Sequence, residues 1–454
     1  MVQMSPGAWL QTLEGMLDEA LPDIELYTNY RDGQHRLRYA TAKFQQAFGG
    51  MFREFADNWC ELIVEAPVER LRVQGFRMGV GAEADAQAWK LWQANNMDST
   101  SSMVHREAVT CGKAYWLVEP PRLPGGFPRI TAEHPAQVMV ATDPGDHRQR
   151  LAGLKRWVDR DGFAYANVFL PDEICKFRSA ERFRTGGRVS WARRGDDPGG
   201  RNLLAEVPLI PVVNAPDMLG GGRSDLRNAL PLQDAINKTI LDMLIASEFS
   251  AFRQRVAIGV EAPKNPDGTP VLNSDIKMAM SKLLTFSSPD AKIAEYSASD
   301  LGNYVKALEP LVQHLAGQTR TPPHYLLGQM VNVSGDALKA AESGLVARTT
   351  EKKTPFGEGH EEAMRLAFKS MGDDERGQAT SAETIWADVE FRNFGELVDG
   401  LTKLRALNIP DEILWEKAGF SPTEIARIKE MQAVDSIFTP SPAPAVTPVV
   451  PVAA

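Results

Sequence analysis

Several short stretches of the chain contain residue types that perform chemistry in other proteins, but none of them completes a motif. The stretch GVGAEA (79–84) holds part of a dinucleotide-binding fingerprint, without the strand–turn–helix setting that the fingerprint needs. GGGRSD (220–225) lacks the lysine of a phosphate-binding loop, so its glycines indicate a flexible joint within 217–226. HEEAM (360–364) begins like a zinc-binding helix, but Met364 stands where the second histidine would be. These stretches therefore predict neither a cofactor nor a catalytic site.

The remaining titratable residues are dispersed in a way that favours structural roles. No two of the seven histidines are four residues apart, and we expect His105 and His134 to be structural polar groups rather than ligands. The acid pairs at 196–197 and 373–374 lie among glycines and charged residues, as in exposed turns. Three cysteines lack CxxC spacing and are expected to be reduced thiols of a cytosolic chain: Cys60, Cys111 and Cys175. We expect no metal and no enzymatic activity.

The composition is that of a globular protein with an acidic balance. Of the 454 residues, 43% are hydrophobic and 24% are charged, and the net charge is −9. An acidic chain does not wrap nucleic acid electrostatically, although it does not exclude DNA that passes nearby without being gripped. No run approaches the ~18 apolar residues of a membrane span, and the first residues lack the features of a secretory signal.

The middle third of the chain has the two-residue period of strands. We expect a strand at 70–77, helices at 10–21 and 83–97, and a β-rich lobe from 102 to 215. Glycine-rich turns separate the strands of this lobe, and such short connections predict antiparallel meander pairing. The predicted strands are 114–119, 137–142, 154–158, 163–170, 174–179 and 188–194.

Two long helices are predicted next, at 230–253 and 300–318, with a small mixed segment between them. Pro231 suits the first turn of one helix, whereas Pro310 lies inside the other and is expected to kink it. The segment at 254–298 contains strand-like and helical stretches separated by a turn.

The stretch PPHYLLGQMVNVSGDALKAAESG (322–344) is an uncharged loop between two helices. Its second helix is expected to begin at Ser334 as the N-cap, with Asp336 in the first turn, where a negative charge meets the positive end of the helix dipole. On the residues alone, the loop is either a plain connection between helices or a surface that touches a partner without holding it tightly.

The C-terminal part is predicted to be helical, with helices at 390–408, 410–418 and 421–432. SPTE (421–424) is a capping box with proline at the first helical position. Residues 438–454 are rich in Pro, Ala and Val and are expected to be disordered.

The succession of these parts resembles the portal proteins of tailed double-stranded DNA bacteriophages, in the siphophage-type family that includes phages of actinobacterial hosts. No single motif is decisive, but the order of the stretches is specific and covers most of the chain. The stretches that carry the resemblance are YRDGQHRLRYA (30–40), NWCELIVEAPVERLRVQGFR (58–77), RSDLRNALPLQDAINKTILDMLIASEFSAFRQR (223–255), PPHYLLGQMVNVSGDALKAAESGLVAR (322–348) and WADVEFRN (386–393).

The resemblance implies an α+β subunit of a ring, usually dodecameric, at one capsid vertex, through which the genome is packaged and ejected. The parts would be a β-rich and helical wing, a long-helix stem, a small α/β clip, a tunnel-loop helix and a helical crown. Their implied boundaries are 1–222 for the wing, 223–253 and 299–321 for the two stem helices, 254–298 for the clip, 322–380 for the tunnel loop with its long helix, 381–437 for the C-terminal wing or crown helices, and 438–454 for the tail.

The resemblance also implies which residues face DNA and which partners dock. The tunnel loop would comprise Gly328, Gln329, Met330, Val331, Asn332, Val333, Ser334 and Gly335. Lys277 and Lys282 of the clip would face either DNA or a docking protein. Implied partners are other copies of the chain, double-stranded DNA, the terminase large subunit, the major capsid and scaffolding proteins and a head-completion or adaptor protein. The place of action would be the virion, after assembly in the host cytoplasm, with no membrane and no cofactor.

Two other classes of protein stay open. A non-channel capsid or tail-adaptor protein would share the helical parts without a central hole. A nucleic-acid-processing enzyme, such as a nuclease, would need a convergent cluster of carboxylates or histidines, which the sequence does not present.

Overall fold

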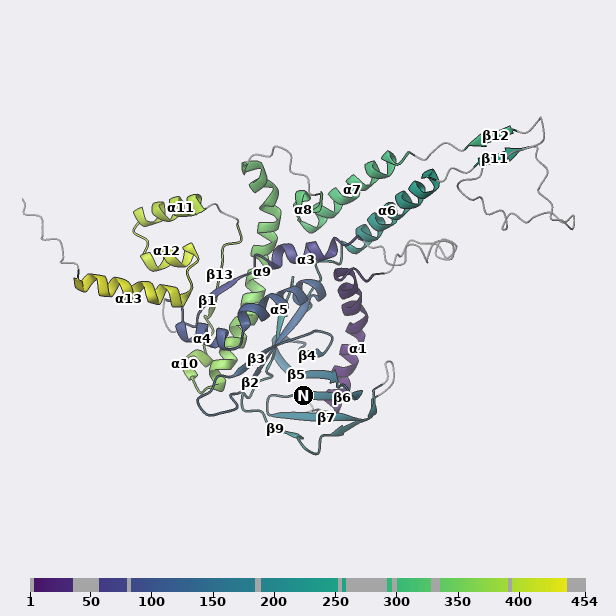
Figure 1. Cartoon of the computed structure of the whole chain (residues 1–454). Coiled ribbons are helices and arrows are strands. Elements are labelled where there is room, and N and C mark those ends of the chain that lie inside the picture. The colour runs from purple at the N-terminus through teal and green to yellow at the C-terminus, as the bar shows by residue number, and fades with distance from the viewer. Residues whose placement is uncertain are drawn as a thin grey trace, which may run out of the picture.

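A computed structural model describes residues 4–35, 57–79, 83–183, 189–251, 255–258, 292–295, 300–327, 335–390 and 394–438. It has a lobe of mixed helices and strands, a projecting pair of helices and a group of C-terminal helices on the other side of α9 (Figure 1). The predicted α+β class is confirmed, since helices and antiparallel sheets both contribute to the lobe.

Four described helices belong to the N-terminal part of the lobe. They are α1 (Pro6–Arg31), α3 (Cys60–Val68), α4 (Ala86–Ala94) and α5 (Met97–Cys111). Ser5 caps α1 by accepting a hydrogen bond from the Ala8 amide, and Asp85 caps α4 in the same way through Gln87 and Ala88. The predicted helices at 10–21 and 83–97 are confirmed, but α5 extends to Cys111, where the sequence indicated the start of the β-rich region.

The larger sheet has six strands. Five of them follow one another in an antiparallel meander, as predicted, whereas the sixth, at Gly199–Arg201, was not predicted. Its strands are β4 (Val138–Asp143), β5 (Asp146–Val158), β6 (Phe163–Phe169), β7 (Glu173–Arg182), β8 (Trp191–Arg193) and β9 (Gly199–Arg201), in the order β4-β5-β6-β7-β8 with β9 also paired to β7. Leu10, Leu13 and Leu17 on one face of α1 are buried in a cluster with side chains of this sheet, so the amphipathic stripe of α1 covers it.

The smaller sheet has the order β10-β2-β3 and lies beside α5 and α9. Its strands are β2 (Lys113–Glu119), β3 (Arg129–Glu133) and β10 (Leu209–Val213), of which only β2 was predicted. Pro211 argues against a strand in the sequence, because proline cannot donate a hydrogen bond to a ladder. Among the described strands β10 pairs only with β2, so it is an edge strand, and an edge strand tolerates proline.

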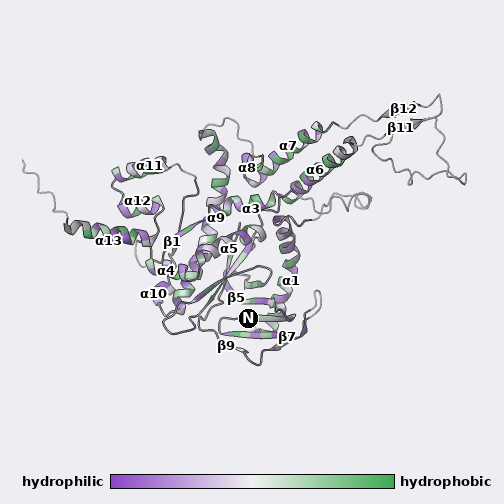
Figure 2. Ribbon diagram, viewed as in Figure 1, coloured by the Kyte–Doolittle hydropathy of each residue, from purple (hydrophilic) through white to green (hydrophobic). Residues whose placement is uncertain are grey.

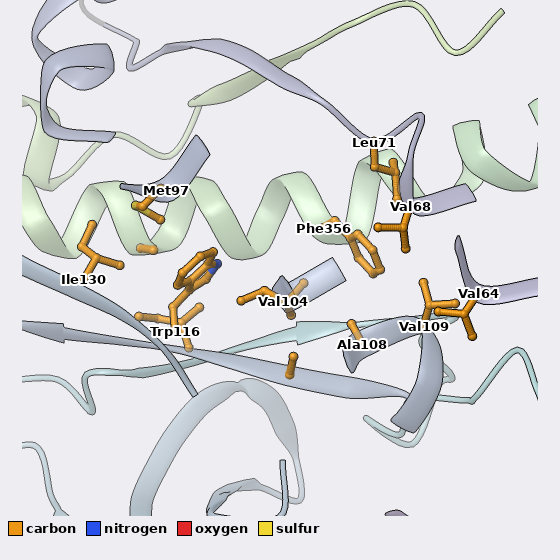
Figure 3. Close-up of a cluster of buried hydrophobic side chains, with 14 of the residues drawn as sticks. Val64, Val68, Leu71, Met97, Val104, Ala108, Val109, Trp116, Ile130 and Phe356 are labelled. Carbon is orange, nitrogen blue, oxygen red and sulfur yellow. The ribbon is translucent and has the colours of Figure 1, made fainter. Parts of the chain in front are cut away.

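The helix α9 (Gly335–Ser370) runs through the lobe and supplies much of its core. Phe356, Met364 and Phe368 on this helix are fully buried. Figure 3 shows Phe356 near Ala108 of α5, and Val104 of α5 between Phe356 and Trp116 of β2. Met364 thus belongs to the core, which explains the methionine in the incomplete zinc motif.

A two-stranded ladder joins the early chain to the late chain. β1 (Val73–Arg77) pairs antiparallel with β13 (Glu383–Trp386), from Arg77 opposite Glu383 to Val73 opposite Trp386, with a register shift between Gly75 and Val73. The predicted strand at 70–77 is confirmed, whereas β13 was not predicted from the sequence.

The projecting pair consists of α6 (Leu230–Ala251) and α7 (Gly302–Thr319), which pack side by side. Both helices were predicted at nearly these positions, with Pro231 in the first turn of α6. At the far end of the pair, β11 (Arg255–Ile258) and β12 (Lys292–Glu295) form an antiparallel ladder (Figure 1). The short α8 (Pro323–Leu327) follows α7.

The C-terminal helices are α10 (Asp374–Gly377), α11 (Phe394–Ala406), α12 (Asp411–Ala418) and α13 (Pro422–Phe438), close to the predicted positions for the last three. The capping box is confirmed, because the Glu424 amide donates to the Ser421 hydroxyl at 3.3 Å while the Glu424 carboxylate accepts from the Ser421 amide at 2.8 Å. The predicted disordered tail at 438–454 lies outside the described residues, apart from Phe438, which ends α13.

Hydrophilic residues are interspersed along the long helices (Figure 2). In the described part of the chain, no helix combines the length and the apolar character needed to cross a membrane.

Candidate functional site

Most of the site residues predicted from the sequence lie outside the described residues. This holds for Gly328, Gln329, Met330, Val331, Asn332, Val333 and Ser334, and for Lys277 and Lys282. Gly335 is described and is the first residue of α9, which agrees with a helix that begins next to Ser334. What the structure does define is how the two ends of the predicted tunnel loop, at Leu327 and Gly335, are attached to the lobe.

A single arginine connects the elements on both sides of the predicted loop. Arg70, between α3 and β1, donates to the Tyr325 hydroxyl of α8 at 2.8 Å and to the Glu342 carboxylate of α9 at 3.3 Å. It also donates to the backbone carbonyl of Val389 at 3.2 Å. The side chains of Arg70 and Glu342 are 15% and 17% exposed, so their ion pair is largely shielded from water. Arg70 therefore fixes the separation of α8 and α9, and the sequence reasoning did not identify it.

A second buried ionic cluster holds α9 at the base of the projecting helices. Arg348 donates through Nε to Asp225 at 2.9 Å, and Lys352 donates through Nζ to the same carboxylate at 3.0 Å. Lys352 also donates to the Asn214 side chain at 2.6 Å, while Asn214 donates to Asp225 at 2.8 Å. Every side chain of the cluster is hydrogen-bonded, which is the condition under which a buried ion pair is tolerated.

Arg348 is also hydrogen-bonded to the backbone of two other elements. It donates to the Thr319 carbonyl at the end of α7 at 2.7 Å and to the Ile63 carbonyl of α3 at 3.0 Å. Its five N–H donors thus join α3, the end of α7 and the segment before α6 to one point on α9. The base of the helix pair is consequently held rigidly to the lobe.

The ionisation of Asp225 follows from these contacts. Burial by itself would raise the pKa of Asp225, but the positive charges of Arg348 and Lys352 outweigh it and hold that pKa well below its usual value. Burial lowers the pKa of Lys352, and the charge of Asp225 opposes this effect. Asp225 is therefore a carboxylate at neutral pH.

The segment predicted as a flexible joint, 217–226, is tightly bonded instead. The Arg223 amide donates to the Asn214 carbonyl at 2.9 Å, and the Asn214 side chain donates to the Arg223 carbonyl at 2.6 Å. Gly222 lies against the backbone of Gly112, so that a Cβ at position 222 would be 2.2 Å from the Gly112 oxygen. The glycine at 222 permits close packing of two backbone segments, and the prediction of flexibility was wrong there.

Buried polar residues tie the start of α6 to the N-terminal helices. The Gln233 side chain accepts from the Trp59 amide at 3.0 Å and donates to the Asp57 carbonyl at 2.6 Å. The Tyr30 hydroxyl of α1 donates to Asp234 at 2.8 Å. A helix that carries polar side chains on its buried face in this way is oriented by hydrogen bonds as well as by apolar packing.

Two histidines far apart in the sequence form a buried pair. His105 of α5 and His360 of α9 are both fully buried, with their Nε2 atoms 2.8 Å apart. The Trp116 indole donates to His360 Nδ1 at 3.1 Å, so His360 carries its proton on Nε2 and donates it to His105. Burial lowers the pKa of His105 to about 3 and holds that of His360 well below its usual value, so both rings are neutral.

The structure can now be compared with the roles predicted for the histidines and the acid pairs. His105 is structural as predicted, although its Nδ1 lacks a well-aligned hydrogen-bond partner in the described chain. His134 is also structural, since it accepts from the Ala136 amide and lies 3.3 Å from Glu107. Asp373 caps α10, and Asp197 pairs with Lys176 at 2.5 Å, so one carboxylate of each acid pair has a structural contact.

A cavity of about 1080 Å³ opens between α1, β2, the 215–228 segment and the start of the ionic cluster on α9. Its lining is mainly polar and includes basic side chains from several elements, namely Lys113, Arg223, Arg227, Arg320, Arg348 and Lys352. Burial lowers the pKa of Lys113, whose ammonium donates to the Gly220 carbonyl at 2.9 Å. No group of His, Cys, Asp and Glu in the described ranges is arranged to hold a metal ion.

Comparison with known proteins identifies the family. The model of the family described as "Phage portal protein, SPP1 Gp6-like" matches residues 21–436. The portal protein of Mycobacterium phage D29 is 30% identical over 449 residues, which cover 93% of this chain and 90% of that protein. The portal protein of Mycobacterium phage L5 is 26% identical over 411 residues, covering 88% and 82%.

Among solved structures, a chain from the neck of a native gene transfer agent particle, computed with C12 symmetry, matches with a TM-score of 0.42 and 13% identity. That match covers 81% of this chain and 88% of the other. The family match over most of the sequence, together with the D29 relative of similar length, shows that the chain belongs to the SPP1 Gp6-like family of phage portal proteins.

Proposed function

We propose that copies of this chain close into a ring, which we expect to be a dodecamer, and that this ring forms the channel for genome packaging and ejection at one capsid vertex. The observation that carries the proposal is the family match over residues 21–436. Copies related by rotation about one axis form a closed ring when each presents one face to a different face of the next.

We assign the parts of the chain within that ring as follows. The lobe at 1–222 is the wing, and the paired helices within 223–253 and 299–321 form the stem. The segment 254–298 between them is the clip, 322–380 contains the tunnel loop and α9, and 381–437 provides the C-terminal wing or crown helices. Arg348 of α9 is hydrogen-bonded to Asp225, just before α6, and to the end of α7. These bonds support a stem that does not bend at its base, so that a movement of the stem also moves α9.

The tunnel loop, 328–335, is proposed to touch DNA weakly. Gln329, Asn332 and Ser334 offer neutral hydrogen bonds that exchange easily between phosphates, and the loop carries no charge. A ring of lysines at these positions would bind phosphates tightly by releasing counterions and would slow the passage of DNA. Arg70 supports this role because it holds α8 and α9, which flank the loop, at a fixed separation.

The proposed partners are double-stranded DNA in the channel, the terminase large subunit, the major capsid and scaffolding proteins and a head-completion or adaptor protein. The protein acts as a structural part of the virion that is assembled in the host cytoplasm, and it has no catalytic role. Lys277 and Lys282 of the clip are proposed to contact either the DNA or a docked protein.

Electron microscopy of the purified protein tests the ring. Rings with a central hole support the proposal, whereas a compact monomer at every concentration would refute it. Solid particles without a hole would favour the non-channel adaptor alternative. Metal-dependent cleavage of DNA by the same preparation would favour the nuclease alternative.

Packaging assays test the loop. We expect a Gln329→Lys, Asn332→Lys variant to form normal rings but to package DNA slowly or to stall, since each subunit adds two cations to the channel. A matched control, Gln11→Lys with Gln432→Lys, adds the same charge at two exposed helix positions. Normal packaging by the loop variant would contradict the proposal that an uncharged loop is needed for DNA to pass.

A further inference from the structure

The turn at 217–221 exposes two adjacent apolar side chains almost completely. Met218 is 98% exposed and Leu219 is 85% exposed. Other strongly exposed leucines of the lobe, such as Leu123 and Leu203, have no equally exposed large apolar neighbour beside them in the sequence. Scattered apolar residues are normal on a surface, but an adjacent pair at the tip of a turn marks a contact site when the turn is also held in a fixed shape.

The turn is held in such a shape by its own hydrogen bonds. The Asp217 carboxylate accepts from the Leu219 amide at 2.9 Å and from the Gly221 amide at 2.8 Å. The Asp217 amide donates to the Gly221 carbonyl at 3.1 Å, which closes the turn. A turn bonded in this way has already ordered its backbone, so binding through its tip costs only the rotamer freedom of the side chains.

The lobe also fixes the turn from outside. Lys113 donates to the Gly220 carbonyl, and Gly220 has a φ of +77°, which a residue with a side chain rarely adopts. A Cβ at Gly220 would lie 3.0 Å from the His147 ring. Behind the turn, Gly222 packs on the Gly112 backbone, so the apolar tip is attached firmly to β2.

Three exposed arginines surround the cavity next to this turn. Arg223 and Arg227 follow the turn in the sequence, and Arg320 lies at the end of α7. Arg320 is 3.5 Å from Glu351, but the two side chains are 56% and 72% exposed, so this pair is weak. The apolar tip therefore stands next to an arginine-lined cavity, and exposed apolar side chains beside arginines are typical of protein–protein interfaces.

We propose that this surface, formed by Met218, Leu219, Arg223, Arg227 and Arg320, docks on the neighbouring copy in the ring. The inference rests on the proposed ring and names the surface that builds it. We name a second copy as the occupant because each copy carries an excess of carboxylates that can pair with these arginines, with 59 acidic residues against 50 Lys and Arg. A DNA duplex would match the arginines but would not bury the Met218–Leu219 tip. A surface that is preformed in the single chain also suits a contact that every copy makes.

The first experiment removes the apolar tip. A Met218→Asp, Leu219→Asp variant is expected to stay monomeric at concentrations where the unaltered chain forms rings, with its circular dichroism unchanged because both side chains lie outside the core. Light scattering after size exclusion measures the mass. The control, Leu123→Asp, places a charge at a leucine that is 74% exposed on a different turn, and it should form rings normally.

The second experiment reverses the charge of two arginines beside the tip. We expect an Arg223→Glu, Arg227→Glu variant to need about tenfold more protein for ring formation, and the ring of the unaltered chain to weaken as salt is raised. A photo-cross-linking residue at position 219 should join two copies of the chain, giving a product of twice the subunit mass.

The outcomes separate this inference from the proposed function. If the unaltered chain forms no ring, the proposed function fails. If it forms rings and the Met218→Asp, Leu219→Asp variant forms them equally well, the docking surface is wrong while the ring stands. Normal rings that no longer take up capsid or adaptor proteins, or that lose only DNA binding, would likewise overturn the assignment to a neighbouring copy.

Discussion

Arg348 illustrates how one side chain can determine the position of several elements. Its guanidinium pairs with Asp225 and donates to two backbone carbonyls, and its side chain is only 9% exposed. We expect Arg348→Met to lower the free energy of unfolding by about 3–5 kcal/mol, because it leaves the Asp225 carboxylate buried beside Lys352 alone. Chemical denaturation of the subunit measures the loss.

A double-substitution cycle shows whether the charge is the cause. Arg348→Met combined with Asp225→Asn should be less destabilised than the sum of the two single changes, because both single changes remove the same Arg348–Asp225 pair and the double variant loses it only once. Arg405→Met, at a side chain that is 72% exposed, is the control and should have little effect. Strict additivity of the two buried changes would contradict the interpretation.

The buried histidine pair predicts a dependence of stability on pH. The pKa of His105 is about 3 in the folded chain and about 6.5 when unfolded, so between these values the unfolded chain binds more protons. Stability is therefore full above the unfolded pKa and falls as the pH is lowered. For His105 the loss at pH 5 is on the order of 2 kcal/mol.

Thermal unfolding at pH 7 and pH 5 measures this effect. The His105→Leu variant should lose less stability than the unaltered chain between these pH values, whatever its stability at pH 7. His314, an exposed residue of α7, is the control, since His314→Leu should keep the full decrease. An equal decrease in all three proteins would show that the pair does not contribute.

At the scale of elements, close backbone packing joins the lobe to the segment that leads into α6. We expect Gly222→Ala to cost about 1–3 kcal/mol, because its Cβ would meet the Gly112 carbonyl and push β2 away from the turn. Gly195→Ala serves as the control, since a Cβ there has no neighbour within 4 Å. Hydrogen exchange of the 113–119 amides should rise in the first variant alone.

The sequence predicted elements best where local chemistry determines them. Pro231 and the SPTE box marked true helix starts, and alternating side chains marked the strands of the large sheet. It missed α5, because serines and threonines such as Ser102, which bonds back to the Ser99 carbonyl, disfavour helices locally. Burial of Val104, Ala108 and Val109 stabilises that helix, and burial is a tertiary effect.

The missed parts of the site have the same origin. Arg70 contacts Tyr325 and Glu342, which are 255 and 272 residues further along the chain, and His105 meets His360 over a separation of 255. No spacing within a single segment reveals such pairs. The charged residues around 225 and 348 were visible in the sequence, but only the fold turns them into one cluster.

At the scale of the whole molecule, the described fold is complete without the last residues. We expect a chain that ends at Phe438 to form rings like the full-length protein, because α13 closes there and the Pro/Ala-rich residues beyond it have the composition of a segment that forms no packed core. Electron microscopy of the truncated chain checks this. A failure to assemble would show that 439–454 takes part in the ring.

The ladder between β1 and β13 determines when the lobe can fold during translation. Arg77 and Glu383 are 306 residues apart, and α9, which fills the core beside Trp116 and His105, lies shortly before β13. A nascent chain still attached to the ribosome has to keep the partners of α9 uncovered until α9 itself has been synthesised. The lobe therefore cannot be completed before α9 and β13 emerge, and a polypeptide terminated ahead of them would expose its apolar interior to chaperones and proteases.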